Sequence, residues 1–276
     1  MSAYGSDTNF GGFEDSFSEK SIRHAFIKKV YSIIMVQLAI TTGFICLFLY
    51  EPKVKLYSMQ HPEMFWIALV LTFILIIVLA CCENVRRSFP ANFICLFLFT
   101  FFQSFLLGSA ASRYDTEAVM IAVAICVVVC LGLTIFAFQT KIDFTICSGF
   151  LMVTVLVLIC FGIVAMIFPG KTIQLIYASL GAIVFSMYLV LDTQMMIGGK
   201  HRYSISPEEY IFAALNIYLD IINIFMSILQ IVGYARGDCK MQYFKFAVLT
   251  FLIYLGDIYG HISGSSFPSR FPTTRN

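Results

Sequence analysis

Long apolar segments separated by short polar ones dominate the pattern of this chain. Seven of these segments are close to the about twenty residues that an α-helix needs to cross a bilayer. They span residues 30–50, 64–82, 92–111, 118–138, 144–168, 173–197 and 209–232. They are too long and too unbroken for the strands of an outer-membrane barrel. The pattern therefore predicts an all-α membrane protein with seven transmembrane helices.

The charges between these segments predict how the chain is oriented. Basic residues precede the first segment and gather again in loops 83–91 and 198–208, whereas loop 51–63 has no basic excess. The basic residues before the first segment are Lys20, Arg23, Lys28 and Lys29. Because short loops rich in Lys and Arg stay in the cytosol, we expect a multi-pass protein with a cytosolic N-terminus.

The composition supports the membrane assignment and excludes other classes. Hydrophobic residues make up 59% of the 276 residues and charged residues only 12%, about half the charged share of a soluble domain. The net charge of +2 gives no reason to expect nucleic acid as a partner. The nine cysteines lie mostly in apolar segments, in neither a disulfide framework nor a zinc pattern. No cofactor is therefore expected.

The chain divides into three parts by its pattern. Residues 1–24 lack periodicity at their start and predict a disordered cytosolic tail. Residues 25–232 form the predicted seven-helix transmembrane domain, and residues 233–276 form an atypical C-terminal extension. Within the extension, the apolar segment 241–259 could just cross the membrane or lie in its interface, and the pattern leaves both readings open.

A stripe of polar residues marks the seventh helix. On a helix with about 100° per residue, its polar residues fall within an arc of about 80°. They are Asn216, Asp220, Asn223, Ser227 and Gln230. Such a stripe cannot face lipid without unpaired polar groups. We therefore expect a central seventh helix with the others packed around it; the amides could also serve only as hydrogen bonds between helices.

Two aspartates stand out within apolar sequence, Asp192 on the sixth helix and Asp220 on the seventh. Ionisable residues inside a membrane span are costly and indicate function. Both lie in the half of the membrane near loop 198–208, offset by about one helical turn. Two close carboxylates cannot both ionise cheaply, so a shared proton would hold the two helices together. Loss of this proton would separate the helices or recruit a hard cation such as Ca²⁺, bound weakly by only two carboxylates.

Local signals near the loop ends complete the candidate site. Arg86 and Arg87 lie at a similar depth to the aspartates and could supply a counter-charge, or could be a topology signal paired with Glu83. Residues 206–209 read Ser-Pro-Glu-Glu, a capping box that predicts the start of the seventh helix. Gly198 predicts the end of the sixth.

Four stretches give the chain a family likeness. They read A-F-I-K-K-V-Y-S-I-I-M-V-Q-L (25–38), L-F-T-F-F-Q-S-F-L-L-G (98–108), L-D-T-Q (191–194) and S-P-E-E-Y-I-F-A-A-L-N-I-Y-L-D-I-I-N-I-F (206–225). With them the chain resembles the Lifeguard branch of the transmembrane Bax-inhibitor-motif family over residues 25–232. The chain departs from this family after the seventh helix, since relatives usually end shortly beyond it.

The resemblance carries expectations about fold and activity. It implies six helices around a central seventh, a pH-sensitive Ca²⁺ leak across intracellular membranes, and suppression of apoptosis. The paired aspartates of the family correspond to Asp192 and Asp220. The arginine that pairs with them in a bacterial relative corresponds to Arg87 or Arg86. The expected partners are the lipid bilayer, Ca²⁺ and protons, together with apoptosis regulators. The expected location is the endoplasmic reticulum, the Golgi or the plasma membrane.

Two alternatives to a leak channel come from other classes of protein. The chain could be a non-conducting interaction protein that restrains death receptors or Bcl-2-type partners, with the polar stripe serving structure alone. It could also be an intramembrane aspartyl protease. That class resembles Y-D on one helix and G-x-G-D on the next, whereas this chain has Leu191-Asp192 and Leu219-Asp220. We therefore expect no enzymatic activity.

Overall fold

A computed structural model of the chain describes residues 10–168, 170–198 and 203–237. Every regular element in these ranges is helical. The elements are α1 (Phe10–Tyr50), α2 (Pro52–Gln60), α3 (Pro62–Cys81), α4 (Glu83–Arg87), α5 (Ala91–Ala111), α6 (Thr116–Gln139), η1 (Phe144–Cys147), α7 (Ser148–Ile167), α8 (Lys171–Ile197), η2 (Pro207–Glu209) and α9 (Tyr210–Ala235). Seven of the helices are long and apolar enough to cross a membrane. The predicted fold class is confirmed, while segment 241–259 lies outside the described residues.

Proline and glycine set several of the helix ends. Pro52 and Pro62 occupy the first position of α2 and α3, where the missing N–H group would have no partner in the helix anyway. The helix α8 ends before Gly198, as the sequence predicts, and this glycine has a φ of 64°. A side chain at that φ would be strained, so glycine suits this stop.

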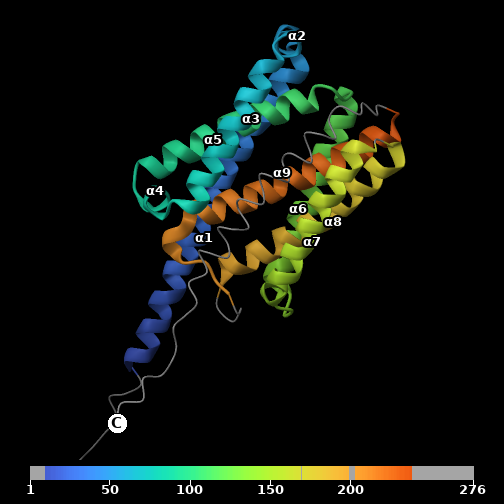
Figure 1. The fold of residues 1–276 in the computed structure, drawn as a ribbon. Helices are drawn as coiled ribbons and strands as arrows, with labels where there is room; N and C mark the ends of the chain where they lie inside the picture. The colour runs from blue at the N-terminus through green and yellow to red at the C-terminus, as the bar shows by residue number, and fades with distance from the viewer. Residues whose placement is uncertain (1–9, 169, 199–202, 238–276) are drawn as a thin grey trace, which may run out of the picture.

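The first helix is longer than the sequence predicts. It already begins at Phe10, so residues 10–24, expected to belong to a disordered tail, are helical in the structure. No proline occurs between Phe10 and Tyr50 to end the helix. In Figure 1 the N-terminal part of α1 projects beyond the rest of the bundle. The span proper is residues Lys20–Tyr50.

The last helix, α9, lies at the centre of the bundle (Figure 1). It packs against α1, α5, α6 and α8, while α3 packs against α5 and α7 packs against α8. In the most apolar part of this span 94% of the residues are buried, against 56% or less in each of the other six. The prediction of a central seventh helix is confirmed. Four spans form its immediate ring, with α3 and α7 outside them.

Close helix contacts inside the bundle depend on small residues, and its outer surface is apolar. A β-carbon added to Gly108 of α5 would lie 2.8 Å from Cδ2 of Phe48 and 3.1 Å from the carbonyl oxygen of Phe44, so this glycine lets α1 and α5 approach closely.

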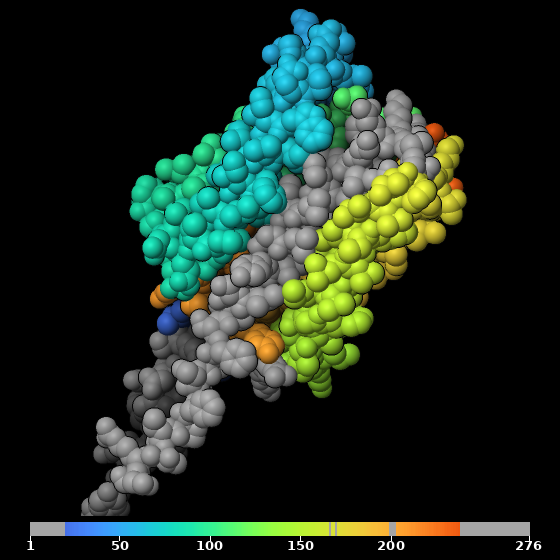
Figure 2. All heavy atoms as spheres, in the orientation of Figure 1, coloured from blue at the N-terminus to red at the C-terminus, as the bar shows by residue number. Residues whose placement is uncertain are grey.

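Large apolar side chains such as Trp66 of α3 and Val128 of α6 point outward. Figure 2 shows α3 and α5 on one flank of the molecule and α7 on the other.

Candidate functional site

The two predicted aspartates lie on neighbouring helices in the interior. Asp220 of α9 is 0% exposed and Asp192 of α8 is 1% exposed. The two helices are joined by residues 198–209 and share the most extensive interface between any two elements of the described chain. Asp192 lies about 8 Å before the end of α8 and Asp220 about 15 Å beyond the start of α9, at about 1.5 Å per residue. The structure thus buries both carboxylates, and by this count of residues their positions along the two helices differ by about 7 Å, little more than one helical turn.

The polar stripe of α9 is enclosed by protein, as the sequence predicts. Asn216, Asn223 and Ser227 are buried, and Gln230 is half-buried near the far end of the helix. The amide nitrogen Nδ2 of Asn223 donates a hydrogen bond of 2.9 Å to the carbonyl oxygen of Leu219 on the same helix. This stripe therefore lines the interior on the same helix as Asp220, rather than contacting lipid.

A glutamine that the sequence did not single out anchors α8 beside Asp192. Gln194 is fully buried, and its Oε1 accepts a hydrogen bond of 2.8 Å from the backbone N–H of Phe144. Its Nε2 donates one of 2.9 Å to the carbonyl oxygen of Ile142. One side chain thus satisfies two backbone groups in the segment before α7. The available signal was a single glutamine two residues after the aspartate, in the L-D-T-Q stretch.

Arg23 of α1 anchors the loop between α8 and α9. Its Nη1 donates a hydrogen bond of 2.7 Å to the carbonyl oxygen of Ile205. The backbone N–H of Ile205 in turn donates one of 3.0 Å to the carbonyl oxygen of Met195 on α8. From the sequence, Arg23 indicated only topology. The structure gives it a contact with the loop that joins the two aspartate helices.

Arg86 and Arg87 bind Glu209 rather than the aspartates. We name these three residues the arginine clamp. The Nε of Arg86 forms an ion pair with Oε2 of Glu209, and the Nε of Arg87 lies 2.5 Å from Oε1 of the same carboxylate. Arg86 is 3% exposed and Glu209 is 7% exposed, so the first of these pairs is buried. The predicted counter-charge for the aspartates is thus used by another carboxylate, the one that directly precedes α9.

The clamp also corrects the predicted capping box. Ser206 makes no side-chain cap hydrogen bond, and residues 207–209 form the 3₁₀ turn η2 instead of the first turn of α9. In a capping box, Glu209 would reach back to a backbone N–H group at the helix start. The hydrogen bond from the charged Arg87 and the ion pair with Arg86 together hold this carboxylate more strongly than one backbone donor would. The local motif therefore yields to tertiary contacts.

Further contacts hold Arg86 in place. Its Nη1 donates a hydrogen bond of 2.8 Å to the carbonyl oxygen of Ala80, at the end of α3. Its guanidinium lies 4.8 Å from the ring centroid of Phe212 on α9. The amide of Asn92 on α5 donates to the carbonyl oxygen of Arg86 at 3.3 Å and to the hydroxyl of Tyr210 at 3.1 Å. The clamp thus joins α3, α4, α5 and the start of α9.

Arg87 forms the more exposed of the two ion pairs in the clamp. Its Nη2 lies 3.2 Å from Oε1 of Glu83, one turn earlier on α4. The hydrogen bond to Glu209, followed by the negative charge of Glu209, raises the pKa of Arg87. Arg87 therefore stays charged at any physiological pH. Lys29 of α1 adds a cation 3.3 Å from the ring centroid of Tyr210.

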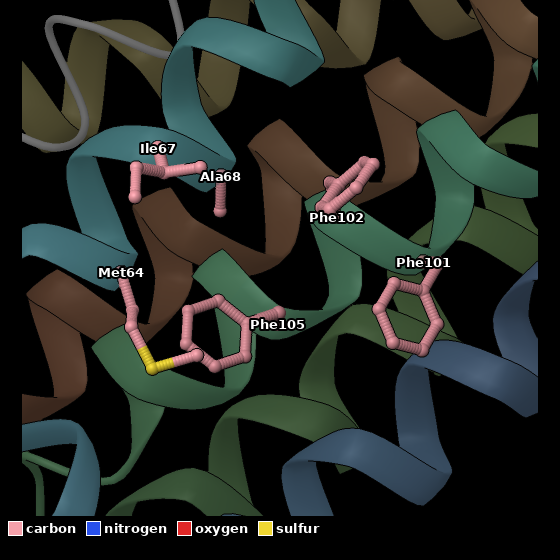
Figure 3. Close-up of a pocket in the computed structure, with 6 residues that line it drawn as sticks. All are labelled: Met64, Ile67, Ala68, Phe101, Phe102 and Phe105. Carbon is pink, nitrogen blue, oxygen red and sulfur yellow. The ribbon is translucent and has the colours of Figure 1, made fainter.

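The structure contains no preformed cation cage in the part it describes. Among those residues, no group of three or more His, Cys, Asp or Glu side chains could hold a metal ion. A pocket of about 140 Å³ lies between α3 and α5 (Figure 3), and neither aspartate lines it. Its lining is Met64, Ile67, Ala68, Phe101, Phe102 and Phe105. This apolar lining suits a hydrocarbon chain of the surrounding lipid rather than an ion.

Fold and site together define a class of protein. It is a multi-pass membrane protein of seven spans in which four pack directly around a central one, with one buried carboxylate on that central helix and another on its neighbour. Intramembrane carboxylates of this kind mark ion or proton pathways.

Comparison with known proteins identifies the family. A family model described as "Inhibitor of apoptosis-promoting Bax1" matches residues 23–237, and the chain belongs to this family. It is 42% identical over 243 residues to protein lifeguard 3 of Homo sapiens, covering 83% of this chain and 78% of that protein. It is 41% identical over 221 residues to protein lifeguard 3 of Mus musculus, covering 79% and 71%. It is 38% identical over 220 residues to Bax inhibitor 1 of Schizosaccharomyces pombe, covering 79% and 80%. The family inferred from the sequence motifs is confirmed.

Proposed function

We propose that this protein suppresses apoptosis as a pH-sensitive Ca²⁺ leak channel, or leak regulator, of an intracellular membrane. The description of its family and the name Bax inhibitor 1 carried by a relative support the anti-apoptotic role. The observation that supports the leak is the burial of Asp192 and Asp220 on two helices that pack against each other. Charge at such a depth needs a proton, a cation or water.

Protonation gives this pair two states. A proton on one carboxylate lets α8 and α9 pack without a net repulsion between the aspartates. When both are ionised, they repel each other unless a cation lies between them. Carboxylate oxygens favour a hard cation such as Ca²⁺, and two of them are too few for tight storage. The pair therefore suits a permeating ion, in a site whose occupancy depends on pH.

Ca²⁺ flux from liposomes across a pH series tests this proposal directly. The wild type is compared with Asp220→Asn and Asp192→Asn, which keep the shape of the side chain and cannot ionise. We expect Asp220→Asn to lower the leak and to flatten its pH dependence. Glu117→Gln is the matched control, because this carboxylate is 79% exposed at one end of α6. It should leak as the wild type does.

Two outcomes of this experiment contradict the proposal. A wild type that releases no Ca²⁺ at any pH rules out the leak. A leak by Asp220→Asn with unchanged rate and pH response rules out the gating role of the pair. Protection of cells by a variant with both aspartates replaced by Asn would instead favour a non-conducting interaction protein.

A further inference from the structure

The clamp fixes the start of the central helix to elements outside the α8–α9 pair through a buried ion pair, that of Arg86 with Glu209. Glu209 directly precedes α9, and the uninterrupted helix from Tyr210 to Ala235 carries Asp220. A helix interior is stiff because each turn is hydrogen-bonded to the next. A displacement of Glu209 along the helix axis therefore moves Asp220 with it.

The partner helix has an anchor of its own. Gln194, two residues after Asp192, holds two backbone groups of the segment before α7. The turn η1, which begins at Phe144 in the segment held by Gln194, packs against α7 and α8, whereas the helix α4 held by Glu209 packs against α3, α5 and α9. Asp192 and Asp220 thus each lie on a helix that has a polar anchor of its own.

We propose that Glu209 is a positioning residue for the aspartate site, which sets the register of α9 against α8 through its clamp to Arg86 and Arg87. This inference rests on the proposed function, because it assigns regulation to the same pair of aspartates. The carboxylate of Glu209 contacts Arg86 and Arg87, and it acts on the aspartates through α9. Release of the clamp frees the start of α9 and changes the alignment of the two carboxylates.

The surroundings of Glu209 stabilise the clamp. Arg86 is buried, and removing its carboxylate would leave an uncompensated charge in the interior, which is unfavourable. The other charged groups near this point are Glu83 and Arg87 of α4, Glu208 beside it in η2, and Lys29 of α1 against Tyr210. The element α5 contributes the neutral Asn92.

Two clamp variants and one matched control test the proposal in the full-length protein. Glu209→Gln removes the charge that both arginines bind. Arg87→Gln removes only the half-exposed arginine of the clamp, so the proposal can still be tested if Glu209→Gln does not fold. Glu208→Gln is the control, because it removes an exposed carboxylate one residue earlier. The first measurement is Ca²⁺ flux from liposomes across a pH series. The second is hydrogen–deuterium exchange of residues 210–220 in lipid nanodiscs.

We expect Glu209→Gln to raise the leak at least about fivefold at the pH where the wild type leaks least, the lower end of typical coupling between sites. The pH profile should flatten, and amide exchange in the first turns of α9 should accelerate. Arg87→Gln should give a smaller change in the same direction, and Arg87→Lys, which keeps the charge, should recover part of it. Glu208→Gln should match the wild type in both measurements.

The two measurements separate this proposal from the proposed function. If the wild type does not leak, the leak function fails, and faster exchange in Glu209→Gln but not in Glu208→Gln still supports the positioning of α9. If the wild type leaks, an unchanged pH profile in both clamp variants overturns the positioning role. Equal effects of Glu208→Gln and Glu209→Gln also overturn it.

Discussion

The helices α6 and α9 differ in a way that reverses the rule for soluble proteins. The span of α6 is the more apolar, with a mean hydropathy of 3.0 against 1.8, yet 17% of it is buried against 94% of the span that contains α9. In water, the more apolar helix would lie inside. Lipid tails are as apolar as leucine, so an apolar helix gains little by leaving them. The difference teaches that in this bundle polar side chains identify the centre.

The inner face of α6 shows how little of an outer helix is enclosed. Its buried residues include Ala118, Ala122 and Cys126, a line of small side chains four residues apart. The Sγ of Cys126 lies 3.8 Å from the carbonyl oxygen of Ile221 on α9. The other faces carry large exposed side chains. This outer helix therefore contributes a narrow contact strip, while α9 is packed on all sides.

Truncation of one leucine on each helix should give the largest contrast. Leu219 of α9 is 0% exposed and Leu131 of α6 is 59% exposed. We expect Leu219→Ala to lower the free energy of unfolding by about 2–5 kcal/mol, because it leaves a cavity in packed protein. Leu131→Ala should change it by less than about 0.5 kcal/mol, since lipid fills the space. Denaturant titration in mixed micelles measures both. Equal losses would show that α9 is not the enclosed helix.

A glycine on each helix gives a smaller contrast of the same kind. A β-carbon on Gly233 of α9 would lie 2.4 Å from Cε1 of Tyr114, whereas one on Gly132 of α6 would meet nothing within 4 Å. We expect Gly233→Ala to destabilise the protein by about 1–3 kcal/mol through overpacking. Gly132→Ala should stabilise it by up to about 1 kcal/mol, the helix propensity difference. Thermal unfolding in detergent compares the two. A neutral Gly233→Ala would mean that Tyr114 moves aside freely.

The sequence predicted the parts of the fold that depend on periodicity. The lengths of the apolar segments gave seven spans, and the polar stripe with Asp220 identified the central helix. Both properties repeat along one helix, so they can be recognised without a partner. The end of α8 before Gly198 could also be predicted from the sequence, because it depends on the backbone conformation of one residue.

The sequence failed where partners had to be chosen. From the sequence, Arg86 and Arg87 could supply a counter-charge to the aspartates, with depth in the membrane as the only guide, or could pair with Glu83, as the structure shows. In the structure they bind Glu209, which the sequence assigned to a helix cap. Depth and helix face place a side chain within several ångströms, whereas an ion pair is decided over about 3 Å. The sequence did not predict the anchoring role of Gln194 for the same reason, since its partners are backbone groups about fifty residues away in the chain.

An exposed ion pair that links the two compared helices should have the smallest effect. Nη1 of Arg236, just after α9, lies 2.8 Å from Oε2 of Glu117 in the first turn of α6. Both side chains are at least one-third exposed, unlike those of Arg86 and Glu209. We expect Glu117→Gln to lower the free energy of unfolding by less than about 1 kcal/mol, because water screens the pair. The difference from the wild type should shrink in about 1 M salt, where screening acts over about 3 Å. Denaturant titration at low and high salt measures it. A loss that is larger and independent of salt would mean that this end of α9 is enclosed as tightly as its start, and that charge holds the central helix at both ends.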